Sequence, residues 1–364
     1  MASTLGRHLQ GATTATLRTS PGPDGATLPP PVPHPLTRYD QVFVTGWDCR
    51  LAVGDAAAAW AAARDGRRCL TYGDQGWAAP LSGPAEDWLT EAVLAAAAAP
   101  WASIADLPGM PAWSVCTSKG DPMGLDPFRN RPDLLVPSLP GALGGHLARH
   151  LGLGVHLSCP VVAACSTGLY ALLAVADAIA QGRARRGLAG AADGALPPWL
   201  RAGFTNLGVL AGATPPDSTV AGGAGSTGFS PVPGAGLVAL ADRPGPWRLV
   251  AGVRLGDARH ETHFSDPATL STALAALWEA LPAPDLIVTH ATGTPAGDRY
   301  EKAGLDQGPW RDVPRLACKP IWGHALGASG AVELAAALEA PVQRMWKLSL
   351  GFGGHLAAVA LERT

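Results

Sequence analysis

Cys165 has the surroundings that best suit covalent chemistry in this chain. It stands between a strand-like run, residues 156–164, and a long apolar helix that the pattern predicts over residues 166–181. Unpaired backbone N–H groups and the positive end of the helix dipole at such a junction should lower the pKa of the thiol and favour the thiolate. Residues 163–168 are small, which leaves room for an acyl group. A buried cysteine alone is more often structural, so a nucleophile needs support from other residues.

Three further segments carry groups that a reactive thiolate needs. His290 ends a predicted buried strand, residues 285–290, and is followed by a turn of Gly and Thr residues. Lys319 and His324 precede a second helix that opens on small residues, and Gly351-Phe352-Gly353-Gly354 is a turn that can bring backbone N–H groups close to a ligand. Singly, these features also fit a satisfied core histidine, a lysine lying along apolar surface and an ordinary turn. Together they indicate a site.

The composition excludes several classes of protein. The net charge of -2 over 364 residues provides no basic field for nucleic acid, and 47% of the chain is apolar, enough for a large core. The six cysteines form no CxxC pair, which favours a reduced, cytoplasmic protein without a metal site. The most apolar stretch, residues 161–180, contains Asp177 and is followed by arginines, so we expect no membrane span and no signal peptide.

Strand and helix patterns alternate along the chain, which predicts an α/β fold with mostly parallel sheets. Residues 105–140 are rich in Pro and Gly and are expected to be loops, and a helix over residues 86–99 is expected to stop at Pro100. Residues 1–39 are rich in Ser, Thr, Pro and Gly and predict a flexible arm. The helices that begin near residues 166 and 327 both open on small residues, as a duplicated core would.

Four segments, taken together, resemble the signature blocks of the elongating β-ketoacyl-acyl-carrier-protein synthases. They are Ala164-Cys165-Ser166-Thr167-Gly168, the run from His290 to Glu301, the run from Lys319 through His324 to Glu333, and Gly351-Phe352-Gly353-Gly354. They occur in the family order, and the resemblance covers about residues 40–362. The chain is short for this family and departs from its pattern in supporting positions. Ala291 stands where the family has Gly, and Pro233, Pro320 and His355-Leu356 also differ.

The resemblance implies a thiolase-like fold with two similar βαβαβαββ halves in a five-layer αβαβα arrangement. The half at residues 40–243 would carry the nucleophile, and the half at residues 244–364 both histidines and the lysine. It also implies a homodimer, or a heterodimer with another ketosynthase-like subunit. An acyl carrier protein would be the partner that delivers the phosphopantetheine arm, and the chain would need no cofactor or metal of its own.

The resemblance further implies a role for each matching residue. Cys165 would take up the acyl group, and the backbone N–H groups of Cys165 and Phe352 would form the oxyanion hole. Neutral His290 and His324 would bind the carbonyl of a malonyl-type extender and assist its decarboxylation. Further positions are the anchoring Lys319, the gating Phe352, the supporting Glu333 and Gly353, and Thr292 and Thr294 against the phosphopantetheine arm.

Three activities are compatible with these residues. The first is decarboxylative Claisen condensation, in polyketide or specialised fatty-acid metabolism, because the supporting residues have diverged. The second is an acyltransferase or hydrolase that passes the acyl group on Cys165 to another nucleophile. The third is a non-catalytic subunit resembling a chain length factor, against which the presence of Cys165 argues.

Overall fold

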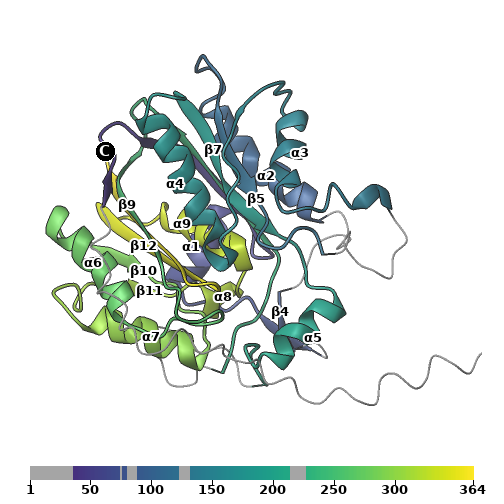
Figure 1. Ribbon diagram of the computed structural model, residues 1–364, viewed down its shortest axis with the longest axis vertical. Coiled ribbons are helices and arrows are strands. Elements are labelled where there is room, and N and C mark those ends of the chain that lie inside the picture. The colour runs from purple at the N-terminus through teal and green to yellow at the C-terminus, as the bar shows by residue number, and fades with distance from the viewer. Residues whose placement is uncertain (1–35, 74–75, 80–87, 123–131, 214–226) are drawn as a thin grey trace, which may run out of the picture. The chain divides into compact units, whose positions relative to one another are not determined.

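An 11-stranded mixed sheet organises the protein (Figure 1). The computed structural model describes residues 36–73, 76–79, 88–122, 132–213 and 227–364. Its strands are β1 (Thr37–Arg38), β2 (Phe43–Arg50), β5 (Ala112–Cys116), β6 (Leu157–Ser158), β7 (Arg186–Asp193), β8 (Gly234–Ala241), β9 (Trp247–Gly256), β10 (Leu286–Val288), β11 (Arg315–Leu316), β12 (Arg344–Gly351) and β13 (His355–Arg363). A separate hairpin pairs β3 (Thr71–Gly73) with β4 (Gly76–Ala78).

The sheet consists of two half-sheets with the same strand order. The full order is β11-β10-β12-β13-β9-β2-β8-β7-β5-β6, with β1 beside β9. The first half has the order β6-β5-β7-β8-β2, and the second half has the order β11-β10-β12-β13-β9. Numbered by their place in the sequence of each half, the strands of both follow the order third, second, fourth, fifth, first. The first three of these strands are parallel and the remaining pairs antiparallel in both halves. The prediction of mostly parallel sheets is therefore wrong, because antiparallel pairs also join the halves, where β2 meets β9.

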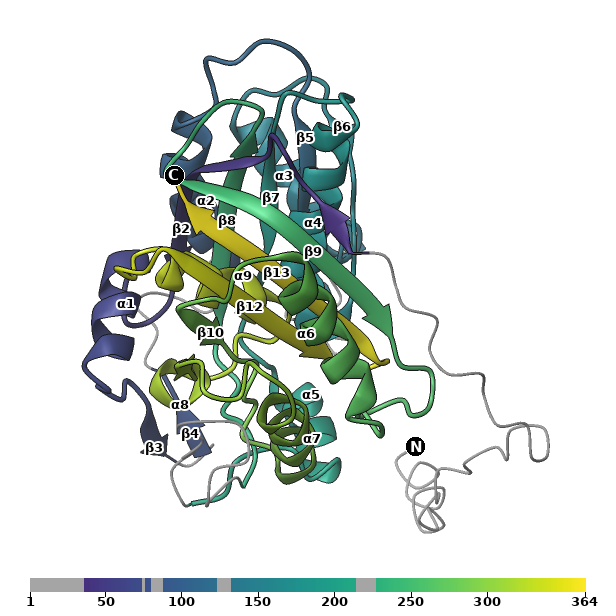
Figure 2. The ribbon, with the colours of Figure 1, turned by 90° about the vertical axis from the view of Figure 1, so that its left-hand side faces the viewer.

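Helices cover both faces of the half-sheets and fill the space between them. They are α1 (Ala56–Arg64), α2 (Trp88–Ala102), α3 (Ala142–His150), α4 (Thr167–Ala180), α5 (Pro198–Asn206), α6 (Ala268–Ala280), α7 (Pro295–Asp306), α8 (Lys319–Trp322) and α9 (Ser329–Ala337). The central helices α4 and α9 contact each other and strands of both half-sheets. On the outer faces, α2 and α3 contact the first half-sheet, and α6, with α7 packed on it, contacts the second (Figure 2). The result is a layered αβαβα arrangement.

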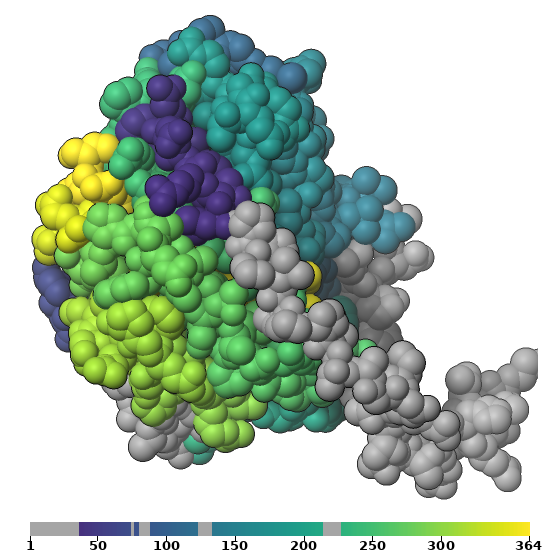
Figure 3. All heavy atoms as spheres, turned by 60° about the vertical axis from the view of Figure 1, so that its left-hand side comes forward, coloured from purple at the N-terminus to yellow at the C-terminus, as the bar shows by residue number. Residues whose placement is uncertain are grey.

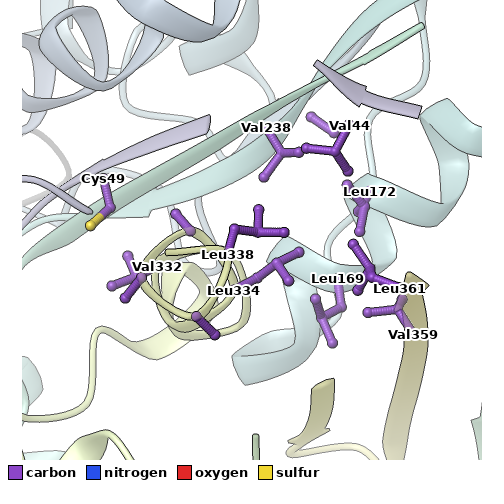
Figure 4. Packing of buried hydrophobic residues seen from close by; sticks show 14 of the residues in the cluster. Val44, Cys49, Leu169, Leu172, Val238, Val332, Leu334, Leu338, Val359 and Leu361 are labelled. Atoms are coloured by element: carbon purple, nitrogen blue, oxygen red, sulfur yellow. The ribbon is translucent and has the colours of Figure 1, made fainter. Parts of the chain in front are cut away.

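The central layer depends on close packing of small and branched side chains. Figure 4 shows Leu334 of α9 on the side of Val238 of β8 and Leu169 of α4, whereas Val332 points to the other side, toward Cys49. The two helices approach so closely that a Cβ atom at Gly168 would lie 2.8 Å from the backbone nitrogen of Ala331. This explains why small residues such as Gly168 and Ala331 stand where the two helices meet.

The structure corrects several predicted elements. Residues 105–140 contain β5, a fully buried strand inside the first half-sheet. The helix α2 continues through Pro100 to Ala102, because a proline in the last turn sacrifices only one backbone hydrogen bond. The strand expected over residues 156–164 is reduced to the two residues of β6.

The structure also bears on the predicted N-terminal arm and on the boundary between the halves. Residues 37–38 were expected in the flexible arm, but they form β1 and pair with β9. Figure 3 shows this purple segment between the green and teal surfaces of the two halves. The rest of the predicted arm, residues 1–35, lies outside the described residues. The boundary at residue 243 stays a prediction and falls in the connection between β8 and β9. Within the described ranges, no helix has the length and apolar character needed to cross a bilayer.

Candidate active site

Cys165 lies on a sharp turn between β6 and α4. The turn is a short 3-10 helix, Ala164–Ser166, and it places Ala164 in the left-handed region at φ 46°. Thr167 closes it, since its hydroxyl donates to the carbonyl of Ala164 (2.7 Å) and accepts from the N–H of Ala163 (3.0 Å). A left-handed alanine is strained, so the surrounding packing must hold this conformation. The turn directs the thiol into a pocket.

That pocket brings together most of the residues that the sequence singles out. It has a volume of about 340 Å³, and its lining includes Cys165, His290, His324, Phe352, Thr292 and Thr294. The first half of the chain provides the cysteine, and the second half provides both histidines. Lys319, Glu333 and Gly353 do not line the pocket; the first two lie behind it and the third in the adjoining turn.

The environment of Cys165 differs from the expectation in one respect. Burial raises the pKa of the thiol to about 12, and the positive charges of Lys319 and Lys119 offset this only in part. The predicted thiolate is therefore wrong for the protein without substrate, because the depth of the site outweighs its position at a helix start. The backbone N–H of Phe352 faces the thiol and favours its ionised form.

The two histidines approach each other across the pocket. Their ring centroids lie 5.8 Å apart at an interplanar angle of 85°. The Nδ1 atom of His324 lies 2.7 Å from the hydroxyl of Ser329, and Phe229 packs edge-on against the same ring at 4.9 Å. Its other nitrogen, Nε2, is buried and has no hydrogen-bond partner among the residues that the structure describes. A buried ring nitrogen in this state is suited to bind a substrate carbonyl.

Both imidazoles are held in the neutral form. Burial lowers the pKa of His290 and of His324 well below the usual value of 6.5, and the positive charge of Lys319 lowers both further. Neutral histidines keep one N–H donor and one acceptor, as the binding of a developing enolate requires. Their charge state is thus the one that the sequence resemblance implies.

Lys319 is buried and fully engaged, unlike a lysine that lies along the surface. Its ammonium group lies 2.7 Å from Oε1 of Glu333 and donates to the backbone carbonyl of His290. It also lies 3.4 Å from Nδ1 of His290. The lysine therefore holds the histidine through its backbone and lies close to its ring, as the expected anchoring role requires.

Two buried charged residues of this site were not among the predicted ones. Lys347 of β12 lies 2.6 Å from Oε2 of Glu333, so that this carboxylate is shared by two lysines. Glu301 of α7 accepts from the N–H groups of His290 and Ala291, both at 2.6 Å, and burial raises its pKa to about 7. Glu301 could have been found, because it ends the motif that begins at His290. For Lys347 the sequence shows only a charged residue within an apolar strand.

The remaining predicted residues border the pocket. The hydroxyls of Thr292 and Thr294 lie 3.0 Å apart, and Thr294 caps α7 by accepting from the N–H of Gly297. Phe352 lines the pocket beside Cys165. Gly353 has φ +80°, which favours glycine, and its N–H donates to the carbonyl of Glu261 at 2.7 Å. In the described ranges, no group of three His, Cys, Asp or Glu side chains is arranged to hold a metal ion.

Comparison with known families gives two adjoining matches. Residues 117–244 match the model of the β-ketoacyl synthase N-terminal domain, and residues 251–352 match that of the C-terminal domain. The 3-oxoacyl-[acyl-carrier-protein] synthase 2 of Vibrio harveyi is 30% identical over 243 residues, and the match covers 60% of this chain. The matched part spans 56% of the length of that relative.

Solved structures show the same fold over most of the chain. A type II PKS acyl-carrier protein in complex with its ketosynthase (AntDE:AntF) gives a TM-score of 0.78 at 18% identity, covering 90% of this chain and 100% of the matched one. The ishigamide ketosynthase/chain length factor gives 0.75 at 21% identity with the same coverage. These similarities confirm the predicted thiolase-like fold.

Proposed function

Because the chain belongs to the β-ketoacyl synthase family, we propose that it catalyses decarboxylative Claisen condensation between an acyl group on Cys165 and a malonyl-type extender. One observation carries this proposal: Cys165 shares a pocket with two buried histidines, and burial lowers the pKa of both imidazoles well below 6.5. A hydrolase would need a base that takes a proton from water, and the lowered pKa values make both imidazoles weak bases, whereas their N–H groups suit an enolate oxygen.

The first step transfers the acyl group to the enzyme. The Cys165 sulfur attacks the thioester carbonyl of an acyl chain on its carrier protein, forming a new S–C bond. The backbone N–H groups of Cys165 and Phe352 stabilise the negative oxygen of the tetrahedral intermediate. The bond to the carrier sulfur then breaks, and that sulfur leaves with the proton of Cys165. Because the free thiol has a raised pKa, deprotonation has to accompany the attack.

The second step forms the carbon–carbon bond. His290 and His324 donate hydrogen bonds to the thioester carbonyl of the extender, and Nε2 of His324 is the unpartnered atom that suits this role. The bond to the extender carboxylate breaks, carbon dioxide leaves, and its electron pair becomes the enolate. The enolate carbon attacks the acyl carbonyl on Cys165. The C–S bond breaks, and the cysteine sulfur takes up a proton from solvent.

Carrier-protein binding completes the proposal. Thr292 and Thr294 contact the phosphopantetheine arm of the carrier protein. Because this arm carries the acyl group, the chain needs no other cofactor.

The six free cysteines fit a reducing cytoplasm. The edge strand β6 is flanked by the exposed Val155 and Val162, 74% and 47% accessible, which supports a dimer with a second copy or a related subunit. The divergent supporting residues favour polyketide or specialised fatty-acid metabolism.

Intact-protein mass spectrometry tests the first step. After incubation with acyl-carrier thioesters, wild-type protein should gain the mass of the acyl group, and Cys165→Ala should gain none. Cys116→Ala, which removes another buried cysteine outside the pocket, should behave as wild type. No mass gain in wild type with any acyl donor would contradict the proposal.

Carbon dioxide release tests the second step. Acylated wild type mixed with a malonyl-carrier thioester should release carbon dioxide and a 3-oxoacyl product together. His324→Ala should still be acylated but should lose condensation by about 100-fold or more. Acyl transfer to an alcohol, amine or water without carbon dioxide release would instead establish the acyltransferase or hydrolase activity.

A further inference from the structure

Three buried ionisable groups surround three consecutive residues, Thr289, His290 and Ala291. Lys347 donates to the carbonyl of Thr289 at 3.0 Å, and Lys319 donates to that of His290. From the other side, Glu301 accepts the N–H groups of His290 and Ala291. Every one of these bonds involves an ionised or ionisable partner, and such bonds are stronger than neutral ones.

This segment contains a strained residue. Ala291 is fully buried and adopts φ 38°, in the left-handed region that a side chain disfavours. The backbone therefore needs external support to keep the conformation that aims His290 into the pocket. Since Ala291 directly follows His290, relaxation of the turn would rotate or displace the histidine.

Lys347 is the least expected part of this support. Its side chain is fully buried in β12, where an apolar residue of similar length would avoid the cost of burying an ammonium group. Its Nζ contacts Oε2 of Glu333 at 2.6 Å and the carbonyl of Leu348 at 2.7 Å, besides Thr289. The lysine thus connects β12 and α9 to the end of β10, directly before the strained turn.

We propose that Lys347 is a positioning residue for His290, which holds the Thr289 carbonyl and thereby fixes the strained turn at Ala291. The inference rests on the proposed function, because it takes His290 to bind the extender. Lys319 already neutralises Glu333, so a second lysine is not required to pair that carboxylate. What Lys347 adds is the bond to the chain at Thr289.

The charge of Lys347 also acts on the ring. Lys319 of α8, His324 and Lys347 of β12 act on the ring of His290, Glu301 of α7 binds its backbone, and Cys165 lines the same pocket. Glu333 of α9 pairs with both lysines. The positive charge of Lys347 lowers the pKa of His290. Removing this charge should raise the pKa of His290. The imidazole would then become protonated at a higher pH than in wild type, and a protonated ring cannot bind the extender as a neutral group.

The test compares the two chemical steps in Lys347→Met. Acylation of Cys165 should keep the wild-type rate, whereas carbon dioxide release should fall about 10- to 100-fold. The acidic limb of its pH profile should move to higher pH. Adding Ala291→Gly, which relieves the strain, should restore part of the lost rate in Lys347→Met but give little gain in wild type. Lys302→Met, at an exposed lysine of α7, should change neither step.

Further variants keep the outcome clear if Lys347→Met does not fold. Lys347→Gln retains a donor for the Thr289 carbonyl without the charge, and should preserve more of the rate while still shifting the pH profile. Unchanged carbon dioxide release and an unchanged profile in a folded variant would overturn the inference. If wild-type protein does not catalyse condensation, the proposed function fails. NMR of the His290 ring then tests the role of Lys347 on its own: an unaltered ring environment in the variant would exclude positioning.

Discussion

The two halves of the molecule build the same backbone turn and use it differently. In the first half Ala164, at φ 46°, precedes Cys165 at the start of α4. In the second half Leu326, at φ 47°, precedes Gly327 at the start of the 3-10 turn that leads into α9. One turn presents a thiol to a pocket, and the other presents no side chain. The left-handed residue that the two turns share therefore does not explain the chemistry.

The difference lies in the strand end that packs on each turn. The first turn contacts the end of β12, where a Cβ atom on Gly351 would lie 2.6 Å from the carbonyl of Ala163. The second contacts the end of β7, where Asp193 accepts the N–H of Gly327 at 2.7 Å. Glycine keeps the first turn open to a ligand, whereas a carboxylate fills and fixes the second. The fold supplies two equivalent positions, and side chains assign one to catalysis and one to structure.

Asp193→Asn should disrupt the second turn, and we expect it to lower the free energy of unfolding more than the other substitutions proposed below. The carboxylate is fully buried and binds Ser118, Lys119 and Gly327 at once. Its removal would leave the Lys119 ammonium without its anionic partner, at a cost of about 3 kcal/mol in the free energy of unfolding. Denaturant unfolding measures this. The control Asp242→Asn, at a more exposed pair with Arg185, should lose under about 1 kcal/mol; equal losses would contradict a special role for the second turn.

Gly327→Ala should show that the second turn has no room for a side chain. A Cβ atom there would lie 2.5 Å from the Cβ of Ser118 and 2.9 Å from Oδ2 of Asp193. We expect a loss of about 2 kcal/mol in the free energy of unfolding from overpacking. Gly203→Ala on α5, where nothing lies within 4 Å, should not destabilise the protein. If Gly327→Ala were as stable as that control, the contrast between a filled and an open turn would not hold.

The pH dependence of stability should arise in the second half more than in the first, because the two pocket histidines belong to the second half. The folded-state pKa of His290 and of His324 is lowered by burial. Each therefore contributes stability above the unfolded value near 6.5, lost as pH falls, at about 1.4 kcal/mol per pH unit. The raised pKa of Glu301, about 7, acts in the opposite sense.

Denaturant unfolding between pH 5 and 7.5 measures this slope. His324→Gln should reduce it, since one proton fewer is taken up on unfolding in acid. His150→Gln, at an exposed histidine of α3 in the first half, should leave the slope unchanged. An equal reduction in both variants would show that burial of the pocket histidines does not control the acid stability.

The sequence allowed the site to be predicted better than the elements around it. Cys165, His290 and His324 are each tied to a local motif, and the structure brings them to one pocket. The strand β5 could not be predicted, because five residues in a Pro- and Gly-rich segment carry no usable period. The direction of the Cys165 pKa was also predicted wrongly, since burial depends on tertiary packing. Lys347 was missed because only the fold brings it beside Glu333 and Thr289.

Two helix caps give the smallest effect and the finest comparison between the halves. Asp55 caps α1 by accepting from Ala58, and Thr294 caps α7 by accepting from Gly297. Replacing either residue with alanine should cost about 1 kcal/mol in the free energy of unfolding, because one backbone N–H at each helix start loses its partner. Only Thr294 also lines the pocket, so only Thr294→Ala should raise the KM for acyl-carrier thioesters. A raised KM in Asp55→Ala as well would mean that stability, and not contact with the phosphopantetheine arm, determines that parameter.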